Sequence, residues 1–292
     1  MPLISVIVPT RLRNHLLPRA LRSLLAQTLQ DLEILVVDDN PPEARLSSDP
    51  ALAPWLQDAR VRVLVHEQPR NAAAARNVGL RAARGEWITF LDDDDAYQPA
   101  KLEKQREYAR QSGMPLGICG VTFHLAHRQR LWLLPGDELG GSELLLQPLA
   151  LPSIFHRNAE RILFDEGLSA GEDAHYFFRL VAHFGVKRIF NVPESLVDVY
   201  PQPGPRVNAN AEGLWQAALA IHREFAPAYG AHAAEAFLAR ARLGYLKLKP
   251  GELQETTKVA WRLWRLRGRK ELRFIMNALL FKVPWARRLL VS

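Results

Sequence analysis

Short apolar runs alternate with stretches of helical periodicity through the first 111 residues, and this alternation limits the folds that the chain can adopt. Runs with the length of buried strands lie at 3–8, 33–37, 61–66 and 87–91. Helical stretches follow the first, third and fourth of them, at 16–25, 72–84 and 99–111. Strands that alternate with helices predict an α/β fold with a mainly parallel sheet flanked by helices. Residues 41–54, rich in Pro, Ser and Asp, are expected to form a loop.

The pattern changes after residue 113. Strand-like runs are found at 116–123, 130–134, 153–156 and 186–191, and a helix is expected at 172–184. The stretch from Tyr200 to Asn210 contains three prolines and a glycine, which makes it a candidate substrate lid. From residue 211 to the end the pattern is helical throughout. We therefore expect boundaries near residues 113 and 210.

Composition narrows the class of protein and its location. A chain of 292 residues with 48% hydrophobic residues can bury a sizeable core in one or two domains. The single cysteine, Cys119, excludes an internal disulfide, and no Cys/His cluster has zinc-ligand spacing. The amino terminus lacks the features of a secretory signal, and no apolar run has the length of a membrane span. A cytoplasmic location is the simplest expectation.

Four consecutive carboxylates, Asp92 to Asp95, directly follow the apolar run at 87–91. Adjacent like charges near a strand end are costly unless a cation or hydrogen-bond donors compensate them. Open α/β sheets bind ligands at the carboxyl ends of their strands. Because the ligands are all oxygens, the pattern predicts a site for Mg²⁺ or Mn²⁺. The alternative is a solvated acidic turn that merely ends the strand.

Six short blocks stand in a fixed order along the first 103 residues. They read VIVPT at 6–10, LAQTL at 25–29, EILVVDD at 33–39, ARNVG at 75–79, GEWITFLDDDD at 85–95 and PAKLE at 99–103. Together they resemble the signature blocks of family 2 glycosyltransferases with the GT-A fold, and Gly171-Glu172-Asp173 resembles a later anchor. Any one block is weak, but six in order are specific. The resemblance implies an inverting enzyme that uses a nucleotide-diphosphate sugar, with a UDP-sugar favoured.

The resemblance assigns roles within the acidic run. Asp94 is the expected metal ligand, Asp93 the expected contact to the donor ribose, and Asp92 a supporting or second metal ligand. An alternative register, Asp93-x-Asp95, has the same spacing. Otherwise Asp95 is expected to cap the helix that opens near Pro99.

Further donor-binding residues follow from the other blocks. Asp39 resembles the residue that accepts a hydrogen bond from the donor base, and Pro9 and Thr10 resemble the loop beneath the nucleoside. Arg76 falls where the family places a basic residue near the nucleotide. Without the family, residues 38–40 would be an ordinary turn and Arg76 a surface cation on a helix.

Glu172 and Asp173 resemble the acceptor-side pair of the family, in which the aspartate is the catalytic base. A carboxylate suits this role because the acceptor hydroxyl must lose its proton as it attacks the anomeric carbon. Read alone, two acids at a helix start would be a favourable dipole pair. One departure from the family stands out: Arg11-Leu12-Arg13-Asn14 follows Thr10, where the family usually continues with Tyr-Asn.

The expected organisation is a nucleotide-sugar-binding half at 1–113, an acceptor-binding half at 114–210 and a helical region at 211–292. The expected reaction is metal-dependent transfer to a hydroxyl of a glycan or lipid-linked acceptor, in surface polysaccharide or lipopolysaccharide biosynthesis. Two alternatives are a sugar-phosphate nucleotidyltransferase and a non-catalytic nucleotide-binding scaffold at the membrane. The former usually has a glycine-rich phosphate loop after the first strand, and residues 9–14 contain no glycine.

Positive charge is concentrated at the end of the chain. Residues 258–292 hold ten Lys or Arg and one acid, a charge of +9, which leaves −2 for residues 1–257 when subtracted from the total of +7. Five cations at helical spacing predict one basic helical face: Lys258, Arg262, Arg265, Arg269 and Arg273. With nearby tryptophans, this face predicts adsorption to the anionic inner face of the cytoplasmic membrane. The alternative is a packed helical hairpin that breaks at Gly268; nucleic acid is not an expected partner.

Overall fold

The computed structural model describes residues 2–68, 70–126, 128–140, 144–145, 150–158, 162–201, 210–248 and 252–280, without the side chains of residues 269, 273, 277 and 280. The chain forms two compact units. Unit 1 comprises Met1–Gly140, Pro148–Glu166 and Arg179–Pro203; unit 2 comprises Gly141–Gln147, Gly167–Phe178 and Gly204–Ser292. The predicted boundaries at 113 and 210 stay a prediction, and residues 202–209 of the predicted lid lie outside the described residues.

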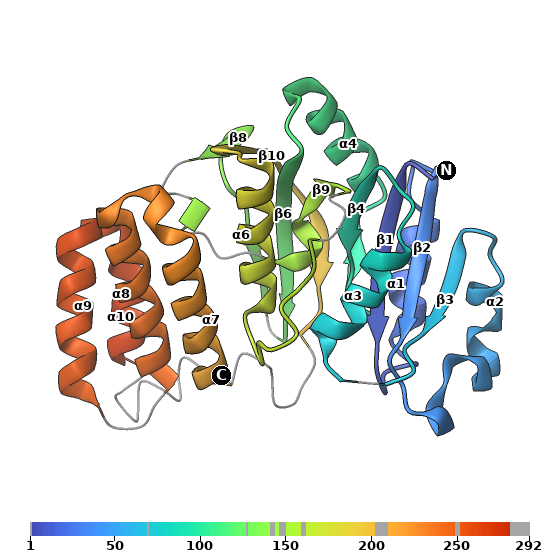
Figure 1. The fold of residues 1–292 in the computed structure, drawn as a ribbon, viewed down its shortest axis with the longest axis horizontal. Helices are drawn as coiled ribbons and strands as arrows, with labels where there is room; N and C mark the ends of the chain where they lie inside the picture. Colours follow the sequence, from blue (N-terminus) through green and yellow to red (C-terminus); the bar gives the residue numbers. More distant parts are fainter. Residues whose placement is uncertain are drawn as a thin grey trace. The chain divides into compact units, whose positions relative to one another are not determined.

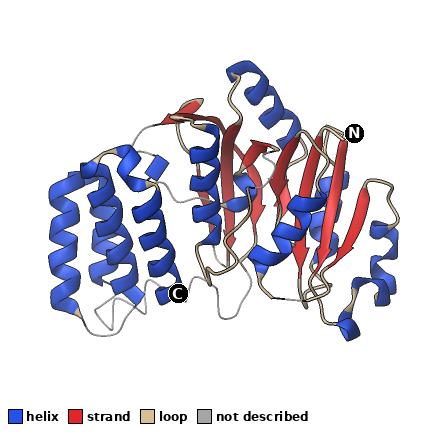
Figure 2. Ribbon diagram, in the orientation of Figure 1, coloured by secondary structure: helices blue, strands red, loops and turns tan. Residues whose placement is uncertain are grey.

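One sheet forms the centre of unit 1 (Figures 1 and 2). Its order is β3-β2-β1-β4-β9-β6-β10-β5, with β7 added to β6 and β8 added to β10. The strands are β1 (Ile4–Thr10), β2 (Leu32–Asp38), β3 (Val61–Val65), β4 (Trp87–Phe90), β5 (Ala96–Tyr97), β6 (Leu116–Leu125), β7 (Arg128–Trp132), β8 (Glu138–Gly140), β9 (Phe155–Arg157) and β10 (Arg188–Val199). The expected α/β architecture is confirmed.

The direction of the strands changes along the sheet. Strands β1 to β4 pair in parallel, as their alternation with helices predicts. The short strand β9 pairs antiparallel with both β4 and β6, whereas β6 and β10 pair in parallel again. The sheet is therefore parallel in its amino-terminal part and mixed beyond β4.

Two helices of unit 1 cover opposite faces of the sheet, α1 (Leu17–Leu25) and α3 (Ala72–Ala82) (Figure 1). Successive strand residues point to opposite faces. Val6 shares a core cluster with Leu21 of α1. Its neighbour Ile7 faces α3, where a Cβ added to Gly79 would lie 2.5 Å from the Ile7 side chain. The glycine at this position therefore permits the close approach of α3 to the sheet.

Two local expectations differ from the structure. The expected loop at 41–54 contains three 3₁₀ turns, Pro42–Ala44, Leu46–Ser48 and Pro50–Leu52, and it runs into the short helix α2 (Ala53–Leu56). These turns form because Leu46 and Leu52 are buried in the core. The helix expected at 72–84 ends already at Ala82, and the N–H of Gly85 donates to Ser5 Oγ.

Unit 2 is helical. It contains α7 (Ala211–Glu224), α8 (Ala231–Leu248), α9 (Leu253–Arg267) and α10 (Leu272–Leu280), with 3₁₀ turns at Ala226–Tyr229 and Gly268–Glu271. Helices α8, α9 and α10 share an apolar core of Ala239, Leu243, Ala260, Leu263, Ile275 and Ala278. Helix α6 (Glu172–Phe184) belongs to unit 2 up to Phe178 and to unit 1 thereafter. Within the described ranges, no helix is both long and apolar enough to cross a membrane.

The five cations predicted on one helical face do not share one helix. Helix α9 ends at Arg267, because Gly268 adopts a φ of 59° and a 3₁₀ turn follows it. The break at Gly268 is the one that the hairpin alternative expects. Arg262 pairs with Glu235 of α8 at 2.7 Å. The remaining basic residues from 282 onward lie outside the described residues.

A lysine lies in the core of unit 1. Lys101, the first residue of α4 (Lys101–Ser112), is fully buried. Its Nζ donates to Thr89 Oγ1 at 2.7 Å and lies 3.9 Å from the centroid of the Tyr97 ring. Burial lowers the pKa of Lys101 from 10.5 to about 7.

This burial makes stability depend on pH. Between the two pKa values the unfolded chain binds a proton that the native protein does not, so native stability falls as pH falls through this range. The free energy of unfolding of Lys101→Met, minus that of the wild type, should rise by up to about 2 kcal/mol from about pH 9.5 to about pH 8. Urea denaturation across pH measures this difference, with Lys187→Met, at an exposed lysine of unit 1, as the control. A difference that does not change with pH would contradict the expectation.

Candidate active site

The run Asp92–Asp95 forms the turn between β4 and β5, and we call it the acidic turn. Its side chains alternate in burial: Asp93 and Asp95 are buried, whereas the side chains of Asp92 and Asp94 are 32% and 14% exposed. The two carboxylates that reach the surface are therefore those of the Asp92-x-Asp94 register. This observation favours that register over Asp93-x-Asp95.

Cations and a hydroxyl compensate the acidic turn. Arg13 Nη2 lies 2.6 Å from Asp93 Oδ1, and Arg13 Nη1 donates to Asp94 Oδ2 at 3.0 Å. Thr10 Oγ1 donates to Asp93 Oδ2 at 2.7 Å. Burial nevertheless raises the pKa of Asp93 to about 7 and also raises the pKa of Asp94, with the Arg13 charge acting in the opposite direction. The turn is therefore only partly neutralised.

Asp95 does not cap α4, which corrects the sequence-based expectation. The residue before α4 is Ala100, and no side chain caps it. The carboxylate of Asp95 instead accepts a hydrogen bond from the Tyr200 N–H at 2.9 Å. Burial raises the pKa of Asp95 to about 8. Asp95 thus fastens the end of β10 to the acidic turn.

The residues predicted beneath the nucleoside meet at the carboxyl ends of β1 and β2. Pro9 and Thr10 end β1, and the Asp39 N–H donates to Thr10 O at 3.0 Å. Asp39 is buried. Its Oδ1 lies 2.6 Å from His66 Nδ1, and its Oδ2 lies 3.6 Å from Arg11 Nη1. Residues 38–40 are therefore more than an ordinary turn, since their acids are held by specific partners.

Arg76 is not a surface cation. Its side chain is buried, Nη2 pairs with Asp92 Oδ1 at 3.0 Å, and the guanidinium lies 5.5 Å from the Phe164 ring centroid. The structure thus brings Pro9, Thr10, Asp39, Arg76 and the acidic turn to one edge of unit 1. Their assigned roles stay predictions.

Sequence reasoning missed Arg13 and His66. Arg13 entered only as part of a departure from the family pattern. The available signal was the parallel pairing of neighbouring strands, which places the loop after β1 beside the turn after β4 and the end of β3 beside Asp39.

Glu172 and Asp173 open α6 within unit 2. Gly171 precedes them with a φ of 74°, and Asp173 Oδ1 accepts a hydrogen bond from the Ala174 N–H at 2.7 Å. Both side chains are half-buried. The acidic turn belongs to unit 1, so the acceptor-side roles of these two residues stay predictions.

The donor set fits a metal ion that is shared with substrate. Among the side chains that the structure describes, no three from His, Cys, Asp and Glu come together as a metal-binding group. Asp92 and Asp94 offer carboxylate oxygens at the surface. Mg²⁺ and Mn²⁺ commonly bind through one or two carboxylates, with water and phosphate oxygens as further ligands. Two surface carboxylates suit such an ion.

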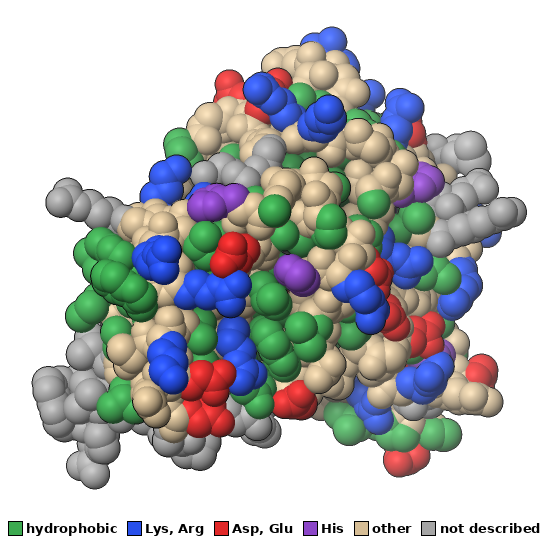
Figure 3. Space-filling model, turned by 60° about the vertical axis from the view of Figure 1, so that its left-hand side comes forward, with side chains coloured by type: hydrophobic (Ala, Val, Ile, Leu, Met, Phe, Trp, Pro, Cys, Tyr) green, Lys and Arg blue, Asp and Glu red, His purple; other side chains and the backbone are tan. Residues whose placement is uncertain are grey.

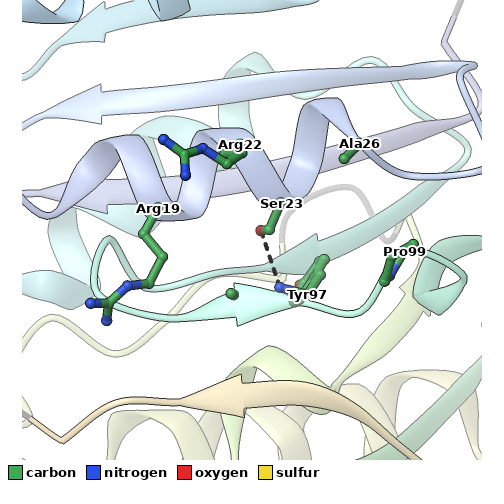
Figure 4. A pocket seen from close by; sticks show the side chains of 7 residues that line it. Arg19, Arg22, Ser23, Ala26, Tyr97 and Pro99 are labelled. Atoms are coloured by element: carbon green, nitrogen blue, oxygen red, sulfur yellow. Dashed lines mark hydrogen bonds between the residues drawn. The ribbon is translucent and has the colours of Figure 1, made fainter.

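A pocket of about 360 Å³ lies between α1 and β5 (Figure 4). Arg19, Ser23 and Tyr97 line it, and the Tyr97 N–H donates to Ser23 Oγ. None of the predicted site residues lines this pocket. Arg19 connects it to the acidic turn, because Arg19 Nη1 donates to the backbone oxygen of Asp94 at 3.1 Å.

Comparison with known sequences identifies the family. Residues 5–153, half of the chain, match Glycosyl transferase family 2. The chain therefore belongs to this family and is a glycosyltransferase. This membership favours the leading interpretation over a nucleotidyltransferase.

Relatives are found among bacterial proteins. The chain is 28% identical over 253 residues to the uncharacterized glycosyltransferase EpsJ of Bacillus subtilis, which covers 77% of this chain and 71% of EpsJ. It is 29% identical over 210 residues to the putative colanic acid biosynthesis glycosyl transferase WcaA of Escherichia coli, covering 63% and 68% of the two chains. A shorter match, 38% identical over 105 residues, covers 35% of this chain and 39% of the Escherichia coli UDP-Glc:alpha-D-GlcNAc-diphosphoundecaprenol beta-1,3-glucosyltransferase WfgD.

The fold is similar to that of a solved structure, Staphylococcus aureus TarS 1-349 in complex with UDP-GlcNAc. The TM-score is 0.66 at 18% sequence identity, and the match covers 99% of this chain and 92% of the TarS chain. The predicted GT-A fold with a helical carboxyl-terminal region is thereby confirmed.

The pairing of Arg76 with Asp92 can be tested by a double-mutant cycle. Arg76→Met leaves Asp92 among three further acids without its guanidinium, and we expect the free energy of unfolding to fall by about 1–2 kcal/mol. Asp92→Asn should cost less. The double variant should be more stable than the sum of the two losses predicts, by about 1 kcal/mol. Urea denaturation of the four proteins measures this, and strictly additive losses would show that the pair is not coupled.

Proposed function

We propose that the protein is a metal-dependent inverting glycosyltransferase. Its donor is a nucleotide-diphosphate sugar, with a UDP-sugar favoured, and its acceptor is a hydroxyl of a glycan or a lipid-linked sugar. The observation that carries the proposal is the exposure of Asp92 and Asp94 at the sheet edge that also holds Thr10 and Asp39. Open α/β sheets bind nucleotides at this edge.

The names of similar proteins support the choice of substrates. TarS was solved with UDP-GlcNAc, and the name of WfgD specifies a UDP-Glc donor and a diphosphoundecaprenol-linked acceptor. WcaA is named for colanic acid biosynthesis. We infer a role in surface polysaccharide or lipopolysaccharide biosynthesis, with residues 1–113 as the donor-binding half, 114–210 as the acceptor-binding half and 211–292 as a helical region.

Each donor-binding residue has a proposed contact. Asp39 accepts a hydrogen bond from the base, above Pro9 and Thr10. Asp93 accepts a hydrogen bond from a ribose hydroxyl; its buried Oδ1 receives no well-formed hydrogen bond within the described residues, although Arg13 Nη2 lies 2.6 Å away. Arg76 fixes Asp92, and Asp92 and Asp94 hold Mg²⁺ or Mn²⁺.

The acidic turn and the pair Glu172 and Asp173 have different proposed tasks in the reaction. When bound, the divalent ion supplies positive charge that stabilises the diphosphate as it leaves. Asp173 accepts the proton of the acceptor hydroxyl while its oxygen attacks the anomeric carbon, and Glu172 supports the acceptor side. The carbon–oxygen bond to the diphosphate breaks as the new bond forms, so the configuration inverts without a covalent sugar intermediate.

The donor proposal is tested by thermal unfolding with UDP, GDP, CDP and dTDP, each with and without Mn²⁺. We expect UDP to stabilise the protein only with Mn²⁺, by about 2.7 kcal/mol at a hundredfold excess over its dissociation constant. Asp94→Ala should abolish the effect, whereas Glu86→Ala, an exposed acid outside the site, should retain it. Asp173→Asn should retain the stabilisation but lose about 10²-fold or more in sugar transfer. No stabilisation by any nucleotide, or a product with retained configuration, would contradict the proposal.

We also propose that unit 2 contacts an anionic membrane surface from the cytoplasmic side. On α9, Trp261 is 62% exposed and stands one helical turn from exposed Lys258 and Arg265. Figure 3, which brings the side of the molecule with α9 forward, shows Lys and Arg side chains beside hydrophobic ones. A tryptophan among cations is typical of surfaces that lie in the lipid headgroup region.

This contact predicts co-sedimentation with phosphatidylglycerol vesicles at low salt. Lys258→Glu changes the charge by two units, and each unit near the surface is worth about 1 kcal/mol, so vesicle binding should fall about tenfold or more. Trp261→Ser should also weaken binding, whereas Arg188→Glu in unit 1 should not. Protein that remains in the supernatant at low salt would rule out the membrane contact and leave the catalytic proposal intact.

A further inference from the structure

Arg13 lies against the acidic turn and forms ion pairs with Asp93 and Asp94. Asp93 is the expected contact to the donor ribose, and Asp94 is the expected ligand of the metal ion. The Arg13 side chain is 43% exposed, so it is accessible to a ligand that enters from solvent. The guanidinium of Arg13 therefore contacts the same carboxylates at which the ribose and the divalent ion are expected to bind.

The loop that carries Arg13 is held in an uncommon conformation. Leu12 has a φ of 55°, in the left-handed region that side-chain-bearing residues rarely adopt. Packing does not explain it, because the Leu12 side chain is exposed. The Leu12 N–H donates to the side chain of Asn40, which is buried and in turn donates to Asp38 Oδ1 at 2.8 Å and Asn14 Oδ1 at 3.1 Å.

This hydrogen-bond network fixes the conformation of the loop at residues 11–14. Asn40 holds the backbone at Leu12, and the turn at Leu12 directs the next residue, Arg13, to the acidic turn. Strained backbone persists only where the surroundings fix it, and it clusters at functional sites. The network therefore fixes the backbone from which the Arg13 side chain reaches the acidic turn.

The ion pairs of Arg13 are incomplete. Asp93 Oδ1 receives no hydrogen bond of acceptable geometry, although Arg13 Nη2 is 2.6 Å away and the carboxylate is fully buried. The contact to Asp94 Oδ2 is a well-formed hydrogen bond at 3.0 Å. A guanidinium that only partly satisfies one buried and one partly exposed carboxylate can be exchanged for another cation.

We propose that Arg13 is a resident cation of the donor site. Its positive charge partly compensates Asp93 and Asp94, and when a divalent ion binds Asp94 the guanidinium turns to the diphosphate of the donor. A divalent ion and the Arg13 guanidinium would share the carboxylate of Asp94, and because like charges repel at this distance the two compete. The planar fork of a guanidinium matches phosphate oxygens bidentately. This inference rests on the proposed function.

The test compares Arg13→Gln, Arg13→Lys and the control Arg22→Gln, which removes an exposed charge from α1. Isothermal titration calorimetry measures the binding of Mn²⁺ alone and of UDP at saturating Mn²⁺. Arg13→Gln should bind Mn²⁺ alone about tenfold more tightly, because a competing charge is gone, and should bind UDP about tenfold more weakly. Arg13→Lys should bind Mn²⁺ like the wild type and UDP more weakly. Arg22→Gln should match the wild type in both.

The opposite signs of the two changes distinguish this role from a structural one. If Arg13→Gln leaves the affinity for Mn²⁺ unchanged or lowers it, or leaves UDP binding unchanged, the inference is overturned while the proposed function stands. If Arg13→Gln fails to fold by circular dichroism, Arg13→Lys decides, and unchanged UDP binding by that variant overturns the inference. A wild type that binds neither Mn²⁺ nor UDP overturns the proposed function itself.

Discussion

The parallel pairing of β1 with β2 and β4 is the constraint on which the site depends. Because Thr10 pairs with Asp38 and Ile7 with Phe90, the three strands end at the same edge of the sheet. Residues far apart in sequence are thereby delivered to one place: the loop after β1, Asp39 after β2 and the acidic turn after β4. A shift of one residue in this register would reverse the face of every following side chain.

The acidic turn concentrates charge where burial makes charge expensive. Half of its carboxylates are inside the protein, and Arg13, Arg76, Thr10 and the Tyr200 N–H compensate them only in part. The pKa of Asp93 therefore stays near 7 despite the adjacent guanidinium. A protein selected for stability alone would bury apolar groups here instead. The arrangement is consistent with a site whose remaining positive charge comes from its ligands.

The sequence predicted what is encoded locally. Helix α6 was expected at its observed bounds, and β1, β2 and β4 within two residues, because short-range periodicity reflects burial. Asp92 and Asp94 were found because they are neighbours in sequence. The contact of Arg13 with Asp94 joins residues 81 apart, and that of His66 with Asp39 joins residues 27 apart, so neither leaves a local pattern. The basic face failed as a prediction because one glycine, Gly268, ends the helix.

The near-neutral pKa of Asp93 connects the geometry to ligand binding. Burial raises the pKa of Asp93 to about 7, and the Arg13 charge and the Thr10 hydroxyl act in the opposite direction. Positive charge beside Asp93, from Arg13 or from a divalent ion on Asp94, favours the ionised form of this carboxyl. The ionised carboxylate is also the better acceptor for a ribose hydroxyl. Positive charge in the acidic turn therefore supports the contact that we propose between Asp93 and the nucleoside.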